Sequence, residues 1–468
     1  MKQTKRQDFT EGNIPKHLLK FAIPMFLGNL FQALYNTVDT IWVGRFLGPE
    51  ALGAVSVGFP IIFALVSLVM GIGMGTTVLV SQYAGARQWD EVRRVVINSF
   101  SLLSLAGLAV SLIGYSFNEA LLRLVNTPEV LIPLASSYIS VFFSGLLFMF
   151  VFNVMGAILR GLGDSKTPLR FLIVATVTNI ILDPLFIFGI GPLPRMEVAG
   201  AALATVIAQG ISAVLAVRHV YKVNGLLSIN IADYKLDREL TLLTLRIGIP
   251  AGLQQTVVSL GALVLMSIVN GFGEIVVAGY GVGVRLDQFA FMPSMSVSMA
   301  VSAVVGQNLG AGNEDRAHLA LRWALILAGG IALVIALGMQ FLAWPISSVF
   351  TRDPGVLAHS TEYLRIISLS YVFLASLFSL TGFLRGAGDT VPPMLITLVS
   401  LWFVRIPLAK YLSLIWGSRG IWIGIAISPV IGLTLSVLYY FKGAWRSKVV
   451  TRPPVLKGSR SINAPLER

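Results

Sequence analysis

Cysteine is absent from this chain, and charged residues are scarce in it. Only 12% of the 468 residues are Asp, Glu, Lys or Arg, about half the usual fraction in soluble domains, whereas 55% are hydrophobic. Without cysteine there is no disulfide framework and no thiolate for metal binding or nucleophilic chemistry. The four histidines lack metal-ligand spacing and there is no HExxH motif, so a zinc protease is not expected. These absences argue against an enzyme and against a resident cofactor.

Long apolar runs recur along the whole chain. Each has about 18 residues or more, the length that a helix needs to cross a bilayer. In hydrocarbon every backbone amide needs an internal partner, so these runs should be helical. We predict an all-α integral membrane protein with twelve membrane-spanning helices. The predicted spans are residues 18–47, 51–84, 95–117, 132–160, 168–191, 198–222, 240–270, 275–309, 318–344, 360–386, 393–415 and 420–442.

The surplus of positive charge, a net +13, follows the predicted topology. The two ends of the chain and the alternate loops are rich in Lys and Arg, whereas the loops between them are poor in both. This asymmetry places both termini in the cytoplasm. The charge is therefore expected to contact anionic lipid headgroups rather than nucleic acid. The N-terminal segment also lacks the apolar core of a signal peptide, so the first span should remain in the membrane.

The chain repeats itself at a constant shift. Residues 159–164 read LRGLGD and residues 384–389 read LRGAGD, a shift of 225 residues. Gln82 matches Gln307 at the same shift, and Pro24 matches Pro250 within one residue. Each half holds an even number of spans, so the halves share one orientation and should enclose a V-shaped cavity where a transporter binds its substrate.

The repeat divides the chain into five parts. We expect a cytoplasmic N-terminal tail over residues 1–17 and an N-terminal six-helix lobe over 18–222. A cytoplasmic linker over 223–239 joins it to a C-terminal six-helix lobe over 240–442. A cytoplasmic tail over 443–468 completes the chain.

Several motifs resemble the multidrug and toxic compound extrusion (MATE) family over roughly residues 15–442. They are VDT with VG at residues 38–44, VSQYAGA at 80–86 and both LRGxGD copies, and residues 179–184 (NIILDP) resemble the DinF-like branch. The resemblance implies antiport in exchange for protons or sodium ions by alternating access. It also implies export of small, amphipathic, mostly cationic compounds, a monomer, and a prokaryotic plasma membrane location.

One departure from the family bears on where the driving ion binds. The NorM-like branch carries acids in the seventh and tenth spans. The comparable stretches here, residues 252–256 (GLQQT) and 371–375 (YVFLA), have none. The first half is therefore the better candidate for ion coupling.

Two acids lie inside predicted spans of the first half. A charge at mid-membrane costs at least about 2.5 kcal/mol, which makes Asp39 and Asp183 candidate functional residues. Asn179 lies one turn before Asp183 on the same face, and the family comparison adds Thr205 to this group. Two buried carboxyl groups can share a proton, and with Asn179 they can hold a sodium ion. A purely structural hydrogen bond is the alternative for each residue.

Further residues are candidates for the substrate cavity. Arg285 and Asp287 lie two positions apart in the eighth span, too far around the helix to pair with each other, so each needs another partner or lines the cavity. Ordinary packing or helix–helix hydrogen bonding is the alternative role for the others, which are Tyr35, Asn36, Gln255, Phe289 and Met292.

Two other functions compete with antiport. A flippase for a lipid-linked precursor would share the two-lobe scaffold, although it often has two more spans and a strongly basic cavity. A membrane enzyme or simple channel is disfavoured, because catalytic clusters are missing and buried carboxylates are present. The substrate, the choice between proton and sodium, and the oligomeric state are not encoded in any short motif.

Overall fold

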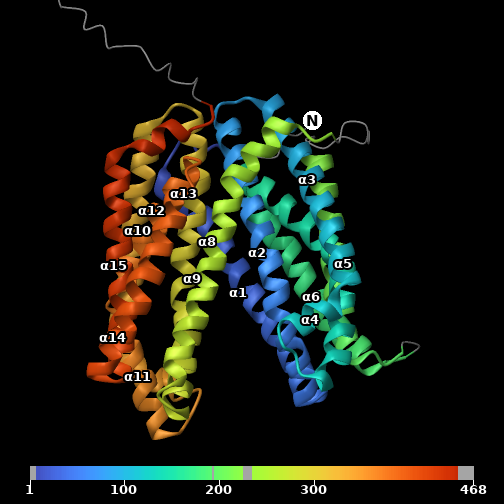
Figure 1. The fold of residues 1–468 in the computed structure, drawn as a ribbon. Coiled ribbons are helices and arrows are strands. Elements are labelled where there is room, and N and C mark those ends of the chain that lie inside the picture. The colour runs from blue at the N-terminus through green and yellow to red at the C-terminus, as the bar shows by residue number, and fades with distance from the viewer. Residues whose placement is uncertain (1–6, 192–193, 225–234, 452–468) are drawn as a thin grey trace, which may run out of the picture.

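The computed structural model is a bundle of long helices arranged in two lobes (Figure 1). It describes residues 7–191, 194–224 and 235–451, and no strand occurs in these ranges. The first lobe consists of α1 (Ile14–Phe46), α2 (Pro49–Gly85), α3 (Trp89–Ser116), α4 (Asn118–Leu124), α5 (Ile132–Gly161), α6 (Lys166–Phe188) and α7 (Glu197–His219). The second consists of α8 (Arg238–Asn270), α9 (Glu274–Gly310), α10 (Glu314–Ser347), α11 (Pro354–Ser368), α12 (Tyr371–Gly386), α13 (Val391–Leu398), α14 (Ile406–Trp416) and α15 (Ser418–Lys442).

The helices confirm the predicted membrane architecture. In the described ranges, ten apolar segments are long enough to cross a membrane, and the pair α11 and α12 forms an eleventh. Helix α2 accounts for the twelfth predicted span, since its 37 residues extend about 55 Å along the axis. The chain is therefore a multi-pass membrane protein. Its predicted linker lies mostly outside the described residues, as do the ends of both tails.

Two predicted spans are not continuous helices. Between α11 and α12 the chain bends by 53°. The Gln340 side chain enters this break and donates to the carbonyl of Arg365 at 2.7 Å, which satisfies a group that the broken helix leaves free. The eleventh span contains a π-helical turn over Val399–Arg405 just before Pro407. Proline lacks the N–H that would continue the α-helical ladder, and a π-turn absorbs this loss.

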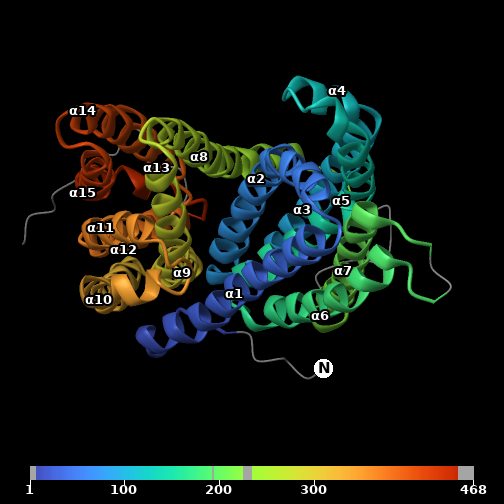
Figure 2. The same ribbon diagram turned by 90° about the horizontal axis from the view of Figure 1, so that it is seen from below.

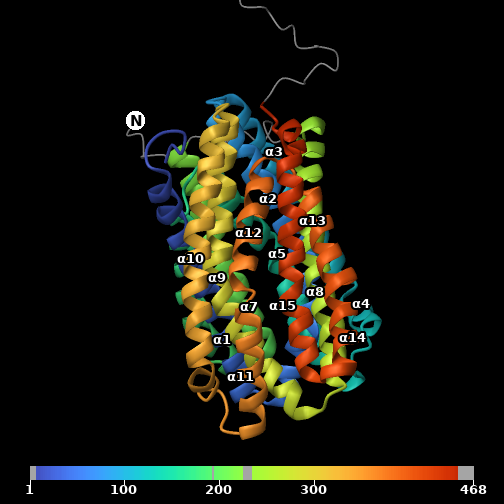
Figure 3. The same cartoon turned by 90° about the vertical axis from the view of Figure 1, so that its left-hand side faces the viewer.

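The first helix of each half packs against the opposite lobe. Leu18 and Phe21 of α1 are buried in the core of the second lobe, while Leu240 and Ile247 of α8 belong to the core of the first. Seen from below, α1 reaches toward α9, and α8 reaches toward α2 (Figure 2). On the outer side of the second lobe, α10, α12 and α15 run side by side (Figure 3).

The lobes meet closely at one end, the closed end, where α2 and α9 finish. A Cβ added to Gly85 would lie 1.9 Å from the carbonyl oxygen of Gln307, and one added to Gly310 would lie 2.0 Å from that of Gln82. Only glycine allows backbones to approach this closely. The two repeat motifs thus contact each other around a pseudo-twofold axis.

The same two glutamines join the lobes through their side chains. Gln307 Nε2 donates to the carbonyl of Gly161 at 3.1 Å, and Gln82 Nε2 donates to that of Gly386 at 2.9 Å. The Oε1 atom of Gln307 accepts from Phe9 N at 3.1 Å, and the Oε1 atom of Gln82 accepts from Val450 N at 2.8 Å. The segments before α1 and after α15 are therefore fastened to the closed end.

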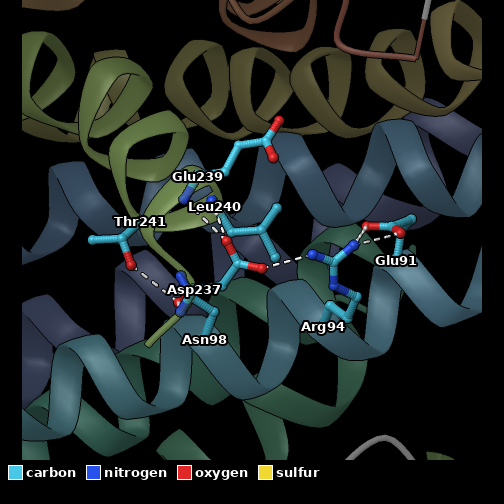
Figure 4. A network of polar contacts seen from close by, with 7 residues as sticks. All are labelled: Glu91, Arg94, Asn98, Asp237, Glu239, Leu240 and Thr241. Atoms are coloured by element: carbon cyan, nitrogen blue, oxygen red, sulfur yellow. Dashed lines mark hydrogen bonds and ion pairs between the residues drawn. The ribbon is translucent and has the colours of Figure 1, made fainter. Parts of the chain in front are cut away.

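A second polar network fastens the start of α8 to α3 (Figure 4). Asp237 caps α8 by accepting from the backbone N–H groups of Glu239 and Leu240, and Arg94 donates to its other oxygen at 2.6 Å. Asn98 Oδ1 accepts from Asp237 N and from Thr241 Oγ1. These bonds join the described part of the linker to the first lobe.

Away from the closed end the lobes diverge (Figure 1). Gly71 and Gly75 of α2 still touch α8 at its Gly248 and Thr244, whereas Gly53 near the start of α2 meets only Leu131 of its own lobe. Side chains on the facing surfaces, such as Asn36 and Gln255, are exposed. A cleft between the lobes therefore opens at the other end, the open end.

We expect Gly85→Ala to destabilise the closed end by about 1–3 kcal/mol, because the new methyl group would overlap the Gln307 carbonyl oxygen. The chain has no cysteine, so Thr244→Cys introduces a single thiol at a buried position between α8 and α2. Maleimide labels this thiol only when the two lobes separate. Labelling should be faster with Gly85→Ala than without it. Gly338→Ala is the matched control, since its Cβ would meet nothing within 4 Å. Equal labelling rates in the two alanine variants would contradict the expected overlap.

Asp237→Ala should lower the free energy of unfolding by about 1 kcal/mol, because α8 loses its cap. The Leu240 N–H and the Arg94 guanidinium hold the pKa of Asp237 below its usual range. Its contribution is thus complete above about pH 4 and is lost as pH falls through the lowered pKa. The melting temperatures of the unaltered protein and of Asp237→Ala should converge at low pH.

Glu239→Ala serves as control, since the Glu239 side chain points away from the network (Figure 4). A difference that widens in acid would contradict the account.

Candidate functional site

Three helices of the first lobe bring five polar side chains together. We call this group the acid-pair cluster: Tyr35 and Asp39 of α1, Asn179 and Asp183 of α6, and Thr205 of α7. Asn179 Nδ2 donates to Asp183 Oδ1 at 3.0 Å and lies 3.4 Å from Thr205 Oγ1. Tyr35 OH donates to Thr205 Oγ1 at 2.8 Å. Asp39 lies near Asp183, Asn179 and Thr205 and interacts electrostatically with this group.

Small residues let α6 and α7 approach closely enough to form this cluster. A Cβ on Gly200 of α7 would lie 2.7 Å from the backbone of Phe186, and one on Gly145 of α5 would lie 2.2 Å from Val206. Asn179 and Asp183 share a face because they are four residues apart in α6. Both are fully buried, so the carboxyl group of Asp183 is removed from bulk water.

The acid-pair cluster contains oxygen atoms without a donor. Among the described residues, Asp39 Oδ1, Asn179 Oδ1 and Asp183 Oδ2 are buried and accept no hydrogen bond. A buried acceptor without a donor costs about 1–3 kcal/mol, and more if it is charged. Two carboxyl groups in contact also repel each other unless a proton or a cation lies between them. The arrangement can therefore accept a proton or a cation.

Tyr138 of α5 is a further neighbour that sequence reasoning missed. It interacts electrostatically with both Asp39 and Asp183 and stacks on Phe142. Tyr138 stands in an apolar span and outside every motif, so the sequence carries no signal that could have marked it.

The second lobe holds a buried carboxylate of a different kind. Asp287 of α9 is 5% exposed, and both of its oxygens accept hydrogen bonds, one from Tyr363 OH at 2.5 Å and one from Tyr371 OH. Arg405 lies near enough to interact with Asp287 and donates from Nε to Ser428 Oγ at 2.8 Å. Asp287 thus has its own partners inside the lobe, and each of its oxygens already accepts a hydrogen bond.

The remaining sequence candidates are divided between cleft and core. Asn36, Gln255, Arg285 and Phe289 are exposed, and the side chain of Asn36 accepts from Gln32. Met292 is 7% exposed and belongs to the packed interior. The structure therefore places Arg285 and Asp287 in different environments, one open and one enclosed.

Comparisons with known proteins identify the scaffold. A family model described as MatE matches residues 24–185 and 250–410. The Bacillus subtilis protein named probable multidrug resistance protein YpnP is 37% identical over 447 residues, covering 95% of this chain and 98% of the relative. The B. subtilis protein named probable multidrug resistance protein YoeA is 32% identical over 454 residues, covering 95% and 97%.

A solved structure matches as well. It is described as the outward-facing conformation of a multidrug resistance MATE family transporter of the MOP superfamily. It is 25% identical in sequence, with a TM-score of 0.87, and the match covers 95% of this chain and 98% of that one. The family model spans more than half of the chain. The two B. subtilis relatives and the solved structure match the chain along almost its whole length. The chain therefore belongs to the MatE family of membrane transporters.

Proposed function

We propose that this protein is a secondary active antiporter that exports small amphipathic compounds in exchange for protons or sodium ions. The multidrug resistance relatives support an export function. The observation that carries the proposal is the group of three buried oxygens, Asp39 Oδ1, Asn179 Oδ1 and Asp183 Oδ2, that lack a donor. Such a group of oxygens binds a proton or a sodium ion in one conformation of the transporter. The ion must be released in the other conformation before the next transport cycle.

Either ion fits this group of side chains. A proton shared between Asp39 and Asp183 would relieve the contact of two carboxyl groups. A sodium ion prefers oxygen ligands. The two carboxylates offer such oxygens, as do the amide of Asn179 and the hydroxyl of Thr205. Tyr35 orients the hydroxyl of Thr205 by donating to it. Both ions supply the same chemistry, one positive charge that neutralises the pair.

Helix α1 links this site to the contact between the lobes. Asp39 lies toward its open end, while Leu18 and Phe21 at its start pack against the second lobe. In α1, Pro24 lies between Phe21 and Asp39, and in α6, Pro184 directly follows Asp183. Each proline leaves a backbone carbonyl without its helical partner, and the helix can bend there. A charge change at Asp39 and Asp183 can therefore alter helix bending in the first lobe and, through α1, the packing at the closed end.

We propose that the closed end faces the cytoplasm. The described parts of both terminal segments lie there, with Lys16, Lys20, Arg446 and Lys448, and Lys and Arg are in excess on cytoplasmic sides of membrane proteins. The open cleft would then face outward, and the similar solved structure is described as outward-facing. The organisms of the relatives point to a bacterial plasma membrane.

Asp183→Asn should abolish gradient-driven export while the protein remains folded, because the amide keeps the shape of the carboxyl group but cannot take up the positive charge. Purified protein in liposomes, tested for dye flux under a proton gradient and then a sodium gradient, measures this. Asp287→Asn is the matched control: it also neutralises a buried acid, yet one tyrosine hydroxyl can still donate to the remaining oxygen while the new amide N–H donates to the other tyrosine. It should keep transport at a lower melting temperature. Full flux from Asp183→Asn would contradict the proposal.

A further inference from the structure

Four helices carry the surfaces that face each other across the cleft: α1 and α2 in the first lobe, and α8 and α9 in the second. Their contacts across the lobe boundary show which face of each helix points toward the other lobe. On an α-helix, residues seven or eleven positions apart return to nearly the same face, since these steps are close to two and three turns. The contacts at the closed end can therefore be extended along each helix toward the open end.

The face of α9 toward the first lobe leads to Arg285. Gln307 on this face donates to Gly161 of the first lobe, and Ser296, eleven residues before it, accepts from Asn29 of α1 at 3.3 Å. Arg285 lies a further eleven residues back. Its side chain is exposed, and it belongs to no ion pair of the described residues. Arg285 therefore points into the cleft.

The same geometry places neutral residues around it. On α8, Gln255 lies eleven residues after Thr244 and seven after Gly248, both of which touch α2. On α1, Asn36 lies seven residues after Asn29, which touches α9. Phe289, one turn from Arg285 in α9, is 49% exposed and adds an apolar surface. The polar groups opposite Arg285 can donate or accept, but they carry no charge.

No acid on these four helices is placed to neutralise Arg285. Their acids are Asp39, Glu50, Glu239, Glu274 and Asp287. Glu50, Glu239 and Glu274 lie in the first turns of their helices, at the ends of the cleft. Asp39 belongs to the acid-pair cluster, and Asp287 bonds to two tyrosines on the opposite face of α9.

Arg285 also lies deep along α9. It is eleven residues, or about 16 Å, from the first residue of that helix. A guanidinium group at this depth, between walls of low dielectric constant, attracts anions and repels cations more strongly than one at the surface. Its fork of N–H donors matches a carboxylate or a sulfonate.

We propose that Arg285 selects the substrate, and that the protein exports amphipathic organic anions, whose acidic group pairs with Arg285 while an apolar ring packs against Phe289. This inference rests on the proposed function and narrows its substrate class. The family resemblance implied mostly cationic compounds, and the charge at the centre of this cleft favours the opposite sign. The acid-pair cluster binds the driving ion, and Arg285 in the other lobe binds the substrate.

Two dyes with the same xanthene ring system test this: fluorescein, which carries a carboxylate, and rhodamine 6G, which is a cation. Their binding to the full chain in detergent is measured by fluorescence anisotropy. The unaltered protein should bind fluorescein more tightly. Arg285→Gln should weaken fluorescein binding about tenfold, the effect of losing one charged hydrogen bond, without weakening rhodamine 6G binding. Arg285→Glu should reverse the preference.

Arg195→Gln is the matched control, because it removes a positive charge that is paired with Glu197 at the open end. It should bind both dyes as the unaltered protein does. Equal fluorescein affinity in Arg285→Gln and Arg195→Gln would overturn the inference, as would tighter binding of rhodamine 6G by the unaltered protein. If Arg285→Gln does not fold, Arg285→Lys keeps the charge and should retain the preference for fluorescein; loss of that preference would also overturn it.

Flux in liposomes separates this inference from the proposed function. Asp183→Asn should bind fluorescein normally and show no gradient-driven flux. If the unaltered protein moves neither dye under either gradient while Arg285→Gln still weakens fluorescein binding, antiport fails and the assignment of Arg285 as the anion-binding residue stands. If gradient-driven flux occurs but does not depend on Arg285 for either dye, antiport stands and the substrate assignment fails.

Discussion

The close backbone contact between the two lobes is the constraint on which the rest of the structure depends. At Gly85 and Gly310 the backbones are too close for any side chain. Beside them, the side chains of Gln82 and Gln307 each donate to a carbonyl of the LRGxGD motif in the opposite lobe. Both terminal segments are fastened to the same glutamines. Because the lobes are fixed at one end, their divergence elsewhere produces a cleft, and any change in lobe arrangement must first separate these contacts.

The duplicated scaffold carries two different buried acids. In the first lobe, Asp39 and Asp183 face each other and leave oxygens without donors. In the second, Asp287 is satisfied by Tyr363 and Tyr371. A satisfied carboxylate stabilises a packed lobe, whereas an unsatisfied pair responds to an arriving ion. On the proposed mechanism, the first lobe bends when the ion binds, while the second keeps its shape.

The sequence predicts the architecture well, because membrane burial imposes long apolar helices and the repeat motifs lie at a fixed shift. The structure brings Asp39, Asn179, Asp183 and Thr205 together as expected, since i,i+4 spacing and family motifs both mark them. Tyr138 and the partners of Asp287 could not be predicted, because they depend on how separate helices pack. The break between α11 and α12 was missed for a similar reason: the Gln340 side chain that stabilises it comes from α10.

The central claim is that the ion at Asp39 and Asp183 controls the arrangement of the lobes. The cysteine-free chain allows two spin labels at exposed open-end positions, Val130 in the first lobe and Val349 in the second, and a distance measurement between them by electron spin resonance. The distance distribution should shift between high and low pH, or on addition of sodium, in the otherwise unaltered protein. It should remain fixed when Asp183→Asn is added. The same shift in the variant would contradict the account.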